Sequence, residues 1–174
     1  MGNPGARYTG TPHNVGYQVT AELAERWGLG KPRDKFNAKL AEGRIRPGGP
    51  RVTMLQPLTY MNESGKAVGP ARGSLKVPPE RVVVVHDEID LPFGEVRSRL
   101  GGGMAGHRGL KSIKQHLGTP EFQRVRVGVG RPDSTDPEQV SAYVLGRFRQ
   151  SPDEVAALVR AAGDETERVI EAAA

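Results

Sequence analysis

Polar side chains gather at the end of one strongly apolar stretch of the chain. Residues 82–85 are four consecutive valines, and directly after them come His86, Asp87, Glu88 and, two positions on, Asp90. An uninterrupted apolar run predicts a strand buried on both faces of an α/β sheet. Ligands bind at the carboxyl ends of such strands. These polar groups could therefore orient a general base, coordinate a metal ion, or begin a solvated turn.

Asp87 lies next to the predicted strand end, where a buried carboxylate needs a partner. His13 is a candidate partner because it stands between Pro12 and Asn14 in a polar loop, with no apolar surface to fill. A carboxylate that holds an imidazole fixes its tautomer and lets it act as a general base. The alternatives are an exposed loop histidine and, for the acidic residues after Asp87, a solvated turn.

Two asparagines raise the same choice between a structural and a chemical role. Asn3 and Asn62 both lie in predicted loops or turns, where asparagine commonly serves as a turn or cap residue. A carboxamide can also donate to, and accept from, an ester or peptide group. We keep both interpretations open for these residues.

Residues 101–106 match the spacing G-x-G-x-x-G between a predicted strand and a predicted helix. The dinucleotide-binding motif also needs an acidic residue about 20 positions later, to hold the ribose. This chain offers Arg124 and Arg126 there, so we do not expect a nucleotide cofactor. A flexible loop, or a backbone that is approached closely by a ligand, remains open.

A metal site would need ligands that converge on the strand end from elsewhere in the chain. The other histidines are His13, His107 and His116, and there is no cysteine. We therefore expect neither a metal nor another cofactor.

The elements that must position these residues alternate between helix and strand. The fold class predicted is α/β, a single domain over residues 1–174 with a mixed β-sheet flanked by helices. An antiparallel hairpin makes the sheet mixed in this prediction, and Thr59 caps a short helix after the hairpin. The expected helices are 15–27, 59–67, 110–117, 136–144 and 151–170, and the expected strands are 35–46, 51–56, 95–100, 124–130 and the valine strand with its polar tip, 82–90.

Composition limits the possible functions. The formal charge of +5 favours a polyanionic partner if the basic residues cluster. No apolar run approaches the roughly 18 residues of a membrane span, and no basic segment leads into an apolar one at the start. The lack of cysteine agrees with a reducing compartment. We expect a cytoplasmic protein without a membrane partner.

Four sequence blocks together resemble bacterial-type peptidyl-tRNA hydrolase over nearly the whole chain. In order, the blocks are GNPGARYTGTPHNVGY, PLTYMNESGKAV, HDEIDLPFGEVRSRLGGGMAGHRGLKSI and FQRVRVGVGRP. The resemblance implies an enzyme that hydrolyses the ester between a peptide and tRNA and so recycles tRNA for translation. It implies peptidyl-tRNA as partner, no metal or cofactor, and a monomer.

Roles follow from this resemblance only at matching positions. It implies that His13 is the base that activates water and that Asp87 holds it in place. The resemblance further implies substrate binding by Asn3, Tyr8, Tyr60, Asn62, His107 and Arg108, and tRNA phosphate binding by Arg99 and Arg126.

The chain departs from the family pattern at three places. Arg108 replaces an asparagine, Pro12 replaces an arginine, and the family's first apolar strand, which leads into its Asn-Pro-Gly segment, has no counterpart before Met1. We therefore expect a reading frame that starts too late, a sheet lacking its first strand, and a poorly anchored Asn3. The alternative function is a non-catalytic tRNA- or RNA-binding module on the same scaffold.

Overall fold

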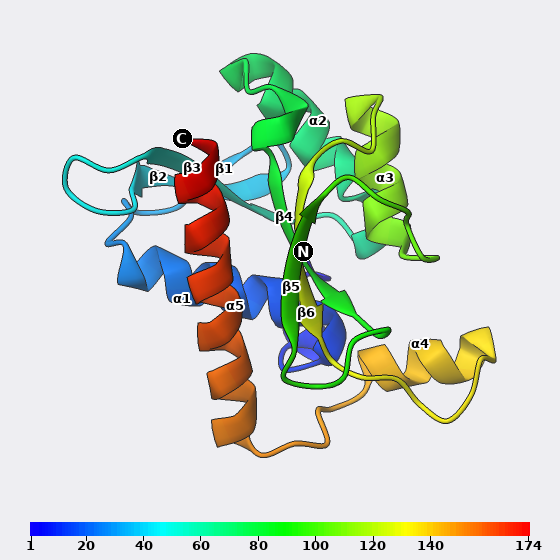
Figure 1. The fold of residues 1–174 in the computed structure, drawn as a ribbon. Helices are drawn as coiled ribbons and strands as arrows, with labels where there is room; N and C mark the ends of the chain where they lie inside the picture. The colour runs from blue at the N-terminus through cyan, green and yellow to red at the C-terminus, as the bar shows by residue number, and fades with distance from the viewer.

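The computed structural model describes residues 1–174 and places their helices around two small sheets (Figure 1). The helices are α1 Val15–Arg26, α2 Gly65–Leu75, α3 Arg108–Leu117, α4 Pro137–Leu145 and α5 Pro152–Ala173. The strands are β1 Arg33–Lys35, β2 Ala38–Arg44, β3 Arg51–Pro57, β4 Val83–Glu88, β5 Val96–Leu100 and β6 Gln123–Gly128. Short 3-10 helices cover Ala6–Tyr8, Pro12–Asn14, Met61–Glu63 and Pro79–Arg81. None of the helices has the length and hydropathy that crossing a lipid bilayer requires.

The central sheet has the order β4-β6-β5 and is mixed, as predicted. Strands β4 and β6 run parallel with His86 opposite Arg126, whereas β5 runs antiparallel to β6. The predicted source of the mixing was wrong. The hairpin of β2 and β3 forms a separate antiparallel sheet with β1, because no strand bridges β3 to β4.

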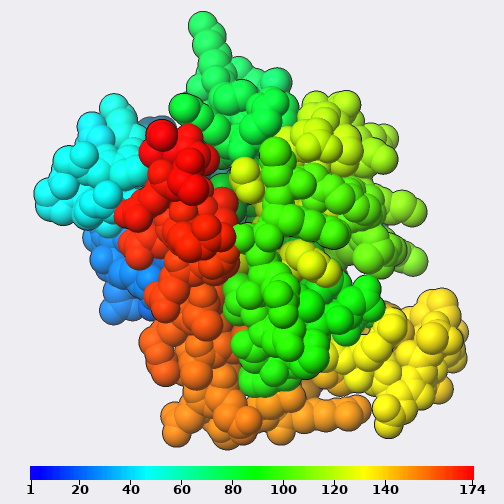
Figure 2. Space-filling view, in the orientation of Figure 1, coloured from blue at the N-terminus to red at the C-terminus, as the bar shows by residue number.

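The valine strand is buried on both faces, as its composition predicted. Val85 packs into one apolar cluster with α1 and α5, and Val84 packs into a second cluster with Met61 and α3. Alternate side chains of a strand point to opposite faces, so consecutive valines serve both clusters. In Figure 1 helix α5 runs along the left of the central sheet, whereas α2 and α3 lie above the sheet and to its right, and the space-filling view shows α5 beside the segment of β5 (Figure 2). Two packed layers therefore fix the tip of β4.

A groove of about 710 Å³ separates the two sheets. Its walls include Met1, β3 from Arg51 to Leu55 and β4 from Val83 to Val85. Strand β3 pairs only with β2, and β4 pairs only with β6, so each strand has an unpaired edge. The expectation of a strand before Met1 stays a prediction.

The predicted helix cap at Thr59 was wrong. Tyr60 precedes the 3-10 turn at Met61–Glu63, no side chain caps that turn, and the Thr59 hydroxyl is buried without a partner. The following helix α2 also continues through Pro70 to Leu75, beyond the predicted end. The caps at Asp136 and Ser151 are confirmed, and the second includes the capping box with Glu154.

Candidate active site

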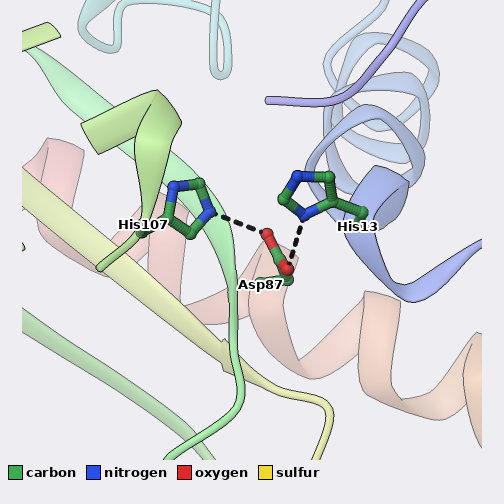
Figure 3. Close-up of side chains that lie close together, drawn as sticks. All are labelled: His13, Asp87 and His107. Carbon is green, nitrogen blue, oxygen red and sulfur yellow. Dashed lines mark hydrogen bonds and ion pairs between the residues drawn. The ribbon is translucent and has the colours of Figure 1, made fainter. Parts of the chain in front are cut away.

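The carboxylate of Asp87 lies between two imidazole rings (Figure 3). His13 Nδ1 is 2.8 Å from Asp87 Oδ2, and His107 Nε2 is 2.9 Å from Asp87 Oδ1. His13 lies in the 3-10 turn before α1, Asp87 near the end of β4, and His107 immediately before α3. The structure thus brings together three residues from two of the four sequence blocks, with Asp87 and His107 20 positions apart in one block and His13 in another.

The hydrogen bonds define a tautomer for each ring. Asp87 is an acceptor when ionised, so His13 Nδ1–H donates to it and leaves His13 Nε2 with a free lone pair. His107 Nε2–H donates to the other oxygen, while His107 Nδ1 accepts from the backbone N–H of Leu110. His13 is therefore set up as a base, and His107 has both ring nitrogens engaged.

The surroundings of Asp87 favour its ionised form. Burial acts to raise the pKa of this carboxyl, but its electrostatic interactions and hydrogen bonds with His13 and His107 outweigh burial and hold the pKa well below its ordinary range. Beside it, His86 is fully enclosed, and burial first and His107 second lower its pKa to about 3. His86 is thus a neutral neighbour, with its Nδ1 on the Asp87 carbonyl at 2.8 Å.

Asn3 is firmly anchored, which corrects the expectation of a loose N-terminal segment. The Asn3 backbone N–H donates to Asn14 Oδ1 at 2.8 Å, and Asn14 Nδ2 donates back to the Asn3 carbonyl at 2.9 Å. Asn3 Oδ1 accepts from the Met61 backbone N–H at 2.6 Å. This arrangement ties Asn3 to the turn that carries Asn62 and leaves Asn3 Nδ2 without a protein acceptor.

Asn14 belongs to the site, although the sequence analysis did not predict a role for it. It is 4 % exposed and joins the segment around Asn3 to the turn of His13. A polar residue directly after the candidate base was the available signal, because a buried asparagine must satisfy both ends of its carboxamide.

The glycine loop is approached closely by the protein's own side chains. A Cβ on Gly102 would lie 2.6 Å from the guanidinium carbon of Arg99, and Gly102 has φ +103°. Arg124 Nη1 donates to the Gly103 carbonyl at 2.6 Å. The loop and α3 connect β5 to β6. These two strands are antiparallel, so the segment lacks the parallel βαβ unit of a dinucleotide site.

Glu88 is not in a solvated turn, contrary to that interpretation. Its side chain is buried at the end of β4, and Glu88 Oε1 accepts from Arg126 Nε at 2.9 Å. The Arg126 side chain is still 19 % exposed, so part of its guanidinium faces outward. Asp90 is exposed, as predicted, 3.4 Å from Arg131.

A profile of the family described as Peptidyl-tRNA hydrolase matches residues 1–174. The chain belongs to this family. The peptidyl-tRNA hydrolase of Halorhodospira halophila is 46% identical over 171 residues, which cover 97% of this chain and 84% of the relative. The one from Rhodospirillum rubrum is 47% identical over 154 residues, and the match spans 88% of this chain but only 61% of that relative.

Solved peptidyl-tRNA hydrolases have the same fold. The crystal structure from Acinetobacter baumannii superposes with a TM-score of 0.85 at 36% identity, covering 98% of this chain and 86% of that chain. A complex of peptidyl-tRNA hydrolase with N-propanol gives the same TM-score and identity. The α/β fold and the family predicted from the sequence are confirmed.

The remaining peptidyl-tRNA hydrolase positions lie at the surface. Tyr60 is 58% exposed, and Asn62, Arg99 and Arg108 are exposed too. Tyr8 is partly buried, with Arg7 5.5 Å from its ring. These side chains make no hydrogen bond to the His13–Asp87 pair, so their substrate roles stay predictions.

His13, Asp87 and His107 also offer ligand atoms within 4.8 Å of one another, a spacing that could surround a small metal ion. In this structure each carboxylate oxygen of Asp87 is instead within hydrogen-bonding distance of one ring nitrogen. These two hydrogen bonds are enough to explain why the three side chains converge, because Asp87 orients both imidazole rings.

Proposed function

We propose that this chain hydrolyses the ester bond between peptide and tRNA in peptidyl-tRNA, with His13 as general base. The observation that carries the proposal is the 2.8 Å contact between His13 Nδ1 and Asp87 Oδ2, which leaves His13 Nε2 free. Family membership supports the substrate class.

The reaction can be written with these residues in place. His13 Nε2 takes a proton from water, and the resulting hydroxide attacks the ester carbonyl carbon to give a tetrahedral oxyanion. The C–O bond to the ribose then breaks, and the imidazolium returns its proton to the ribose oxygen. The products are a peptide acid and free tRNA. Asp87 keeps the His13 ring in one orientation and stabilises its protonated form.

Carboxamides near the base supply the hydrogen bonds that such an intermediate requires. Asn3 Nδ2 has no protein acceptor, and Asn62 follows the Met61 N–H to which Asn3 is bound. We assign these two groups to the peptide or the oxyanion, since donors aimed at developing charge lower the barrier most. Tyr8, Tyr60 and Arg108 are assigned to substrate contact, and Arg99 and Arg126 to tRNA phosphate.

The proposal needs no metal or other cofactor. It also implies work in the cytoplasm, where tRNA is used in translation, and a chain that acts as a monomer. Elution of the active fraction at a mass near 18.8 kDa would support the monomer.

Replacing the base gives the direct test. In His13→Ala, release of peptide from a peptidyl-tRNA should fall by about 10²–10⁴-fold, the range that general base catalysis contributes. Binding of tRNA should stay near its original strength, because His13 acts on the ester and not on the phosphates. The matched control is His116→Ala, which removes an exposed histidine on α3 away from Asp87.

Unchanged turnover in His13→Ala would refute the assignment of the base. Salt-sensitive tRNA binding with no ester cleavage by the unaltered chain would instead favour the RNA-binding module.

A further inference from the structure

His107 is a predicted substrate contact whose ring lies 5.5 Å from the ring of His13, yet both of its ring nitrogens are already hydrogen-bonded. Nε2–H donates to Asp87 Oδ1 at 2.9 Å, and Nδ1 accepts from Leu110 N–H at 3.3 Å. The His107 side chain is also only 12 % exposed. A ring in this state offers a substrate neither a donor nor an acceptor.

The position of His107 at the start of α3 makes its Nδ1 a hydrogen-bond acceptor. The N-terminus of a helix has unsatisfied backbone N–H groups and a partial positive charge, and both favour an acceptor there. A protonated ring would place an N–H at Nδ1 against the Leu110 N–H, which already points at that atom. The two hydrogen bonds therefore fix the ring with its Nδ1 lone pair directed at Leu110 and its Nε2–H directed at Asp87.

Neighbouring rings hold this imidazole in place. The His86 ring stands edge-on to His107 with centroids 5.2 Å apart, and the His13 ring lies 5.5 Å away at a tilt of 41°. His86 is buried in β4, so α3 and β4 fix His107 together. The oxygen that His107 occupies is the one His13 does not use.

We propose that His107 is a positioning residue for the base, which couples the start of α3 to Asp87 and withholds part of the carboxylate's charge from His13. Donation to Oδ1 draws negative charge toward that oxygen. Less charge then remains at Oδ2 to stabilise protonated His13, so more of the base is free at neutral pH. His107 thereby tunes the proposed esterase and does not bind its substrate; this inference rests on the proposed function.

Two amide substitutions separate the contacts of His107. The side-chain amide of glutamine places its nitrogen near the position of Nε2, so His107→Gln keeps a donor for Asp87 but makes a poor helix cap. Asparagine caps helices well through its side-chain oxygen but is too short to reach Asp87. His107→Gln therefore loses the helix cap, and His107→Asn loses the hydrogen bond to Asp87.

We expect crossed results from the pair. In His107→Asn the acid limb of the kcat/KM profile should move to higher pH, with KM little changed, and the melting temperature should hold. In His107→Gln the acid limb should stay where it is in the unaltered chain, while the melting temperature should fall by about 2–4 °C. His116→Asn serves as the control for replacing a histidine of α3.

An NMR titration of the His13 ring follows the same effect without turnover. Its midpoint should rise in His107→Asn and not in His107→Gln, and this holds even if the chain cleaves no ester. An unmoved midpoint in His107→Asn would overturn the positioning role. So would a raised KM in both variants with an unmoved acid limb, which is the signature of direct substrate contact. A chain that shows the NMR shift but no cleavage would refute only the proposed function.

Discussion

A carboxylate that accepts hydrogen bonds from two imidazoles serves both, and each oxygen of Asp87 has its own ring. The pairing of Asp87 with His13 could be predicted, because a buried acid at a strand end needs a partner and His13 had no apolar role. The second pairing could not. It depends on where α3 begins, which turns His107 Nδ1 toward Leu110 and Nε2 toward Asp87.

Removing the charge of Asp87 should cost activity without unfolding the chain. In Asp87→Asn one oxygen becomes an NH₂ group, which cannot accept from an imidazole N–H, so one ring must turn or change tautomer. We expect kcat/KM to fall by about 10²–10⁴-fold, since loss of the correct tautomer removes most of the base catalysis. Asp90→Asn, an exposed carboxylate on the same segment, is the matched control. Equal activities of the two variants would contradict the role of Asp87.

Among the elements, β4 was predicted best from the sequence. The pairing of the other strands around it was predicted least well. Four valines predicted a strand buried on both faces, and the polar tip followed from the same run. Local pattern carries no information about which strands meet across a sheet, so the hairpin was assigned to the central sheet when it forms its own. Glu88 was misjudged similarly, because its partner Arg126 comes from β6, distant in sequence.

The glycine loop gives a prediction that separates strain from chemistry. In Gly102→Ala the new methyl group would meet Arg99 at 2.6 Å, at a backbone φ of +103°. We expect a loss of about 1–3 kcal/mol in unfolding free energy and a higher KM for peptidyl-tRNA as Arg99 is displaced, with kcat less affected. Gly103→Ala is the matched control, because nothing lies within 4 Å of a Cβ there. The same KM in both alanine variants would argue against Arg99 as a phosphate contact.

Across the whole molecule, stability should depend on pH through two buried bases. Burial lowers the pKa of the Met1 amino group from 8.0 to about 5 and the pKa of His86 from 6.5 to about 3. The unfolded chain then binds more protons than the folded chain below pH 8, so stability rises with pH. Asp87, whose folded pKa is lowered, contributes fully at these pH values and loses its contribution only in stronger acid.

Urea unfolding at several pH values measures this dependence. For the chain that begins at Met1, we expect the unfolding free energy to rise with pH by up to about 1.4 kcal/mol per unit above pH 6.5, where the Met1 amino group alone contributes, and by up to about twice that between pH 5 and 6.5, where His86 contributes as well. A glycine added before Met1 converts the amino group to an amide, and the slope above pH 6.5 should then largely vanish. An identical slope in both chains would show that the Met1 amino group is not its cause.

The groove between β3 and β4 affects how the protein behaves at high concentration. Each bordering strand has a row of backbone N–H and C=O groups with no strand beside it, next to apolar side chains. An uncovered edge of this kind is a template for a strand from another molecule. Aggregation through pairing of these strand edges should therefore be faster in concentrated solutions than in dilute ones. A change that covers the two edges should slow this aggregation without altering the site at Asp87.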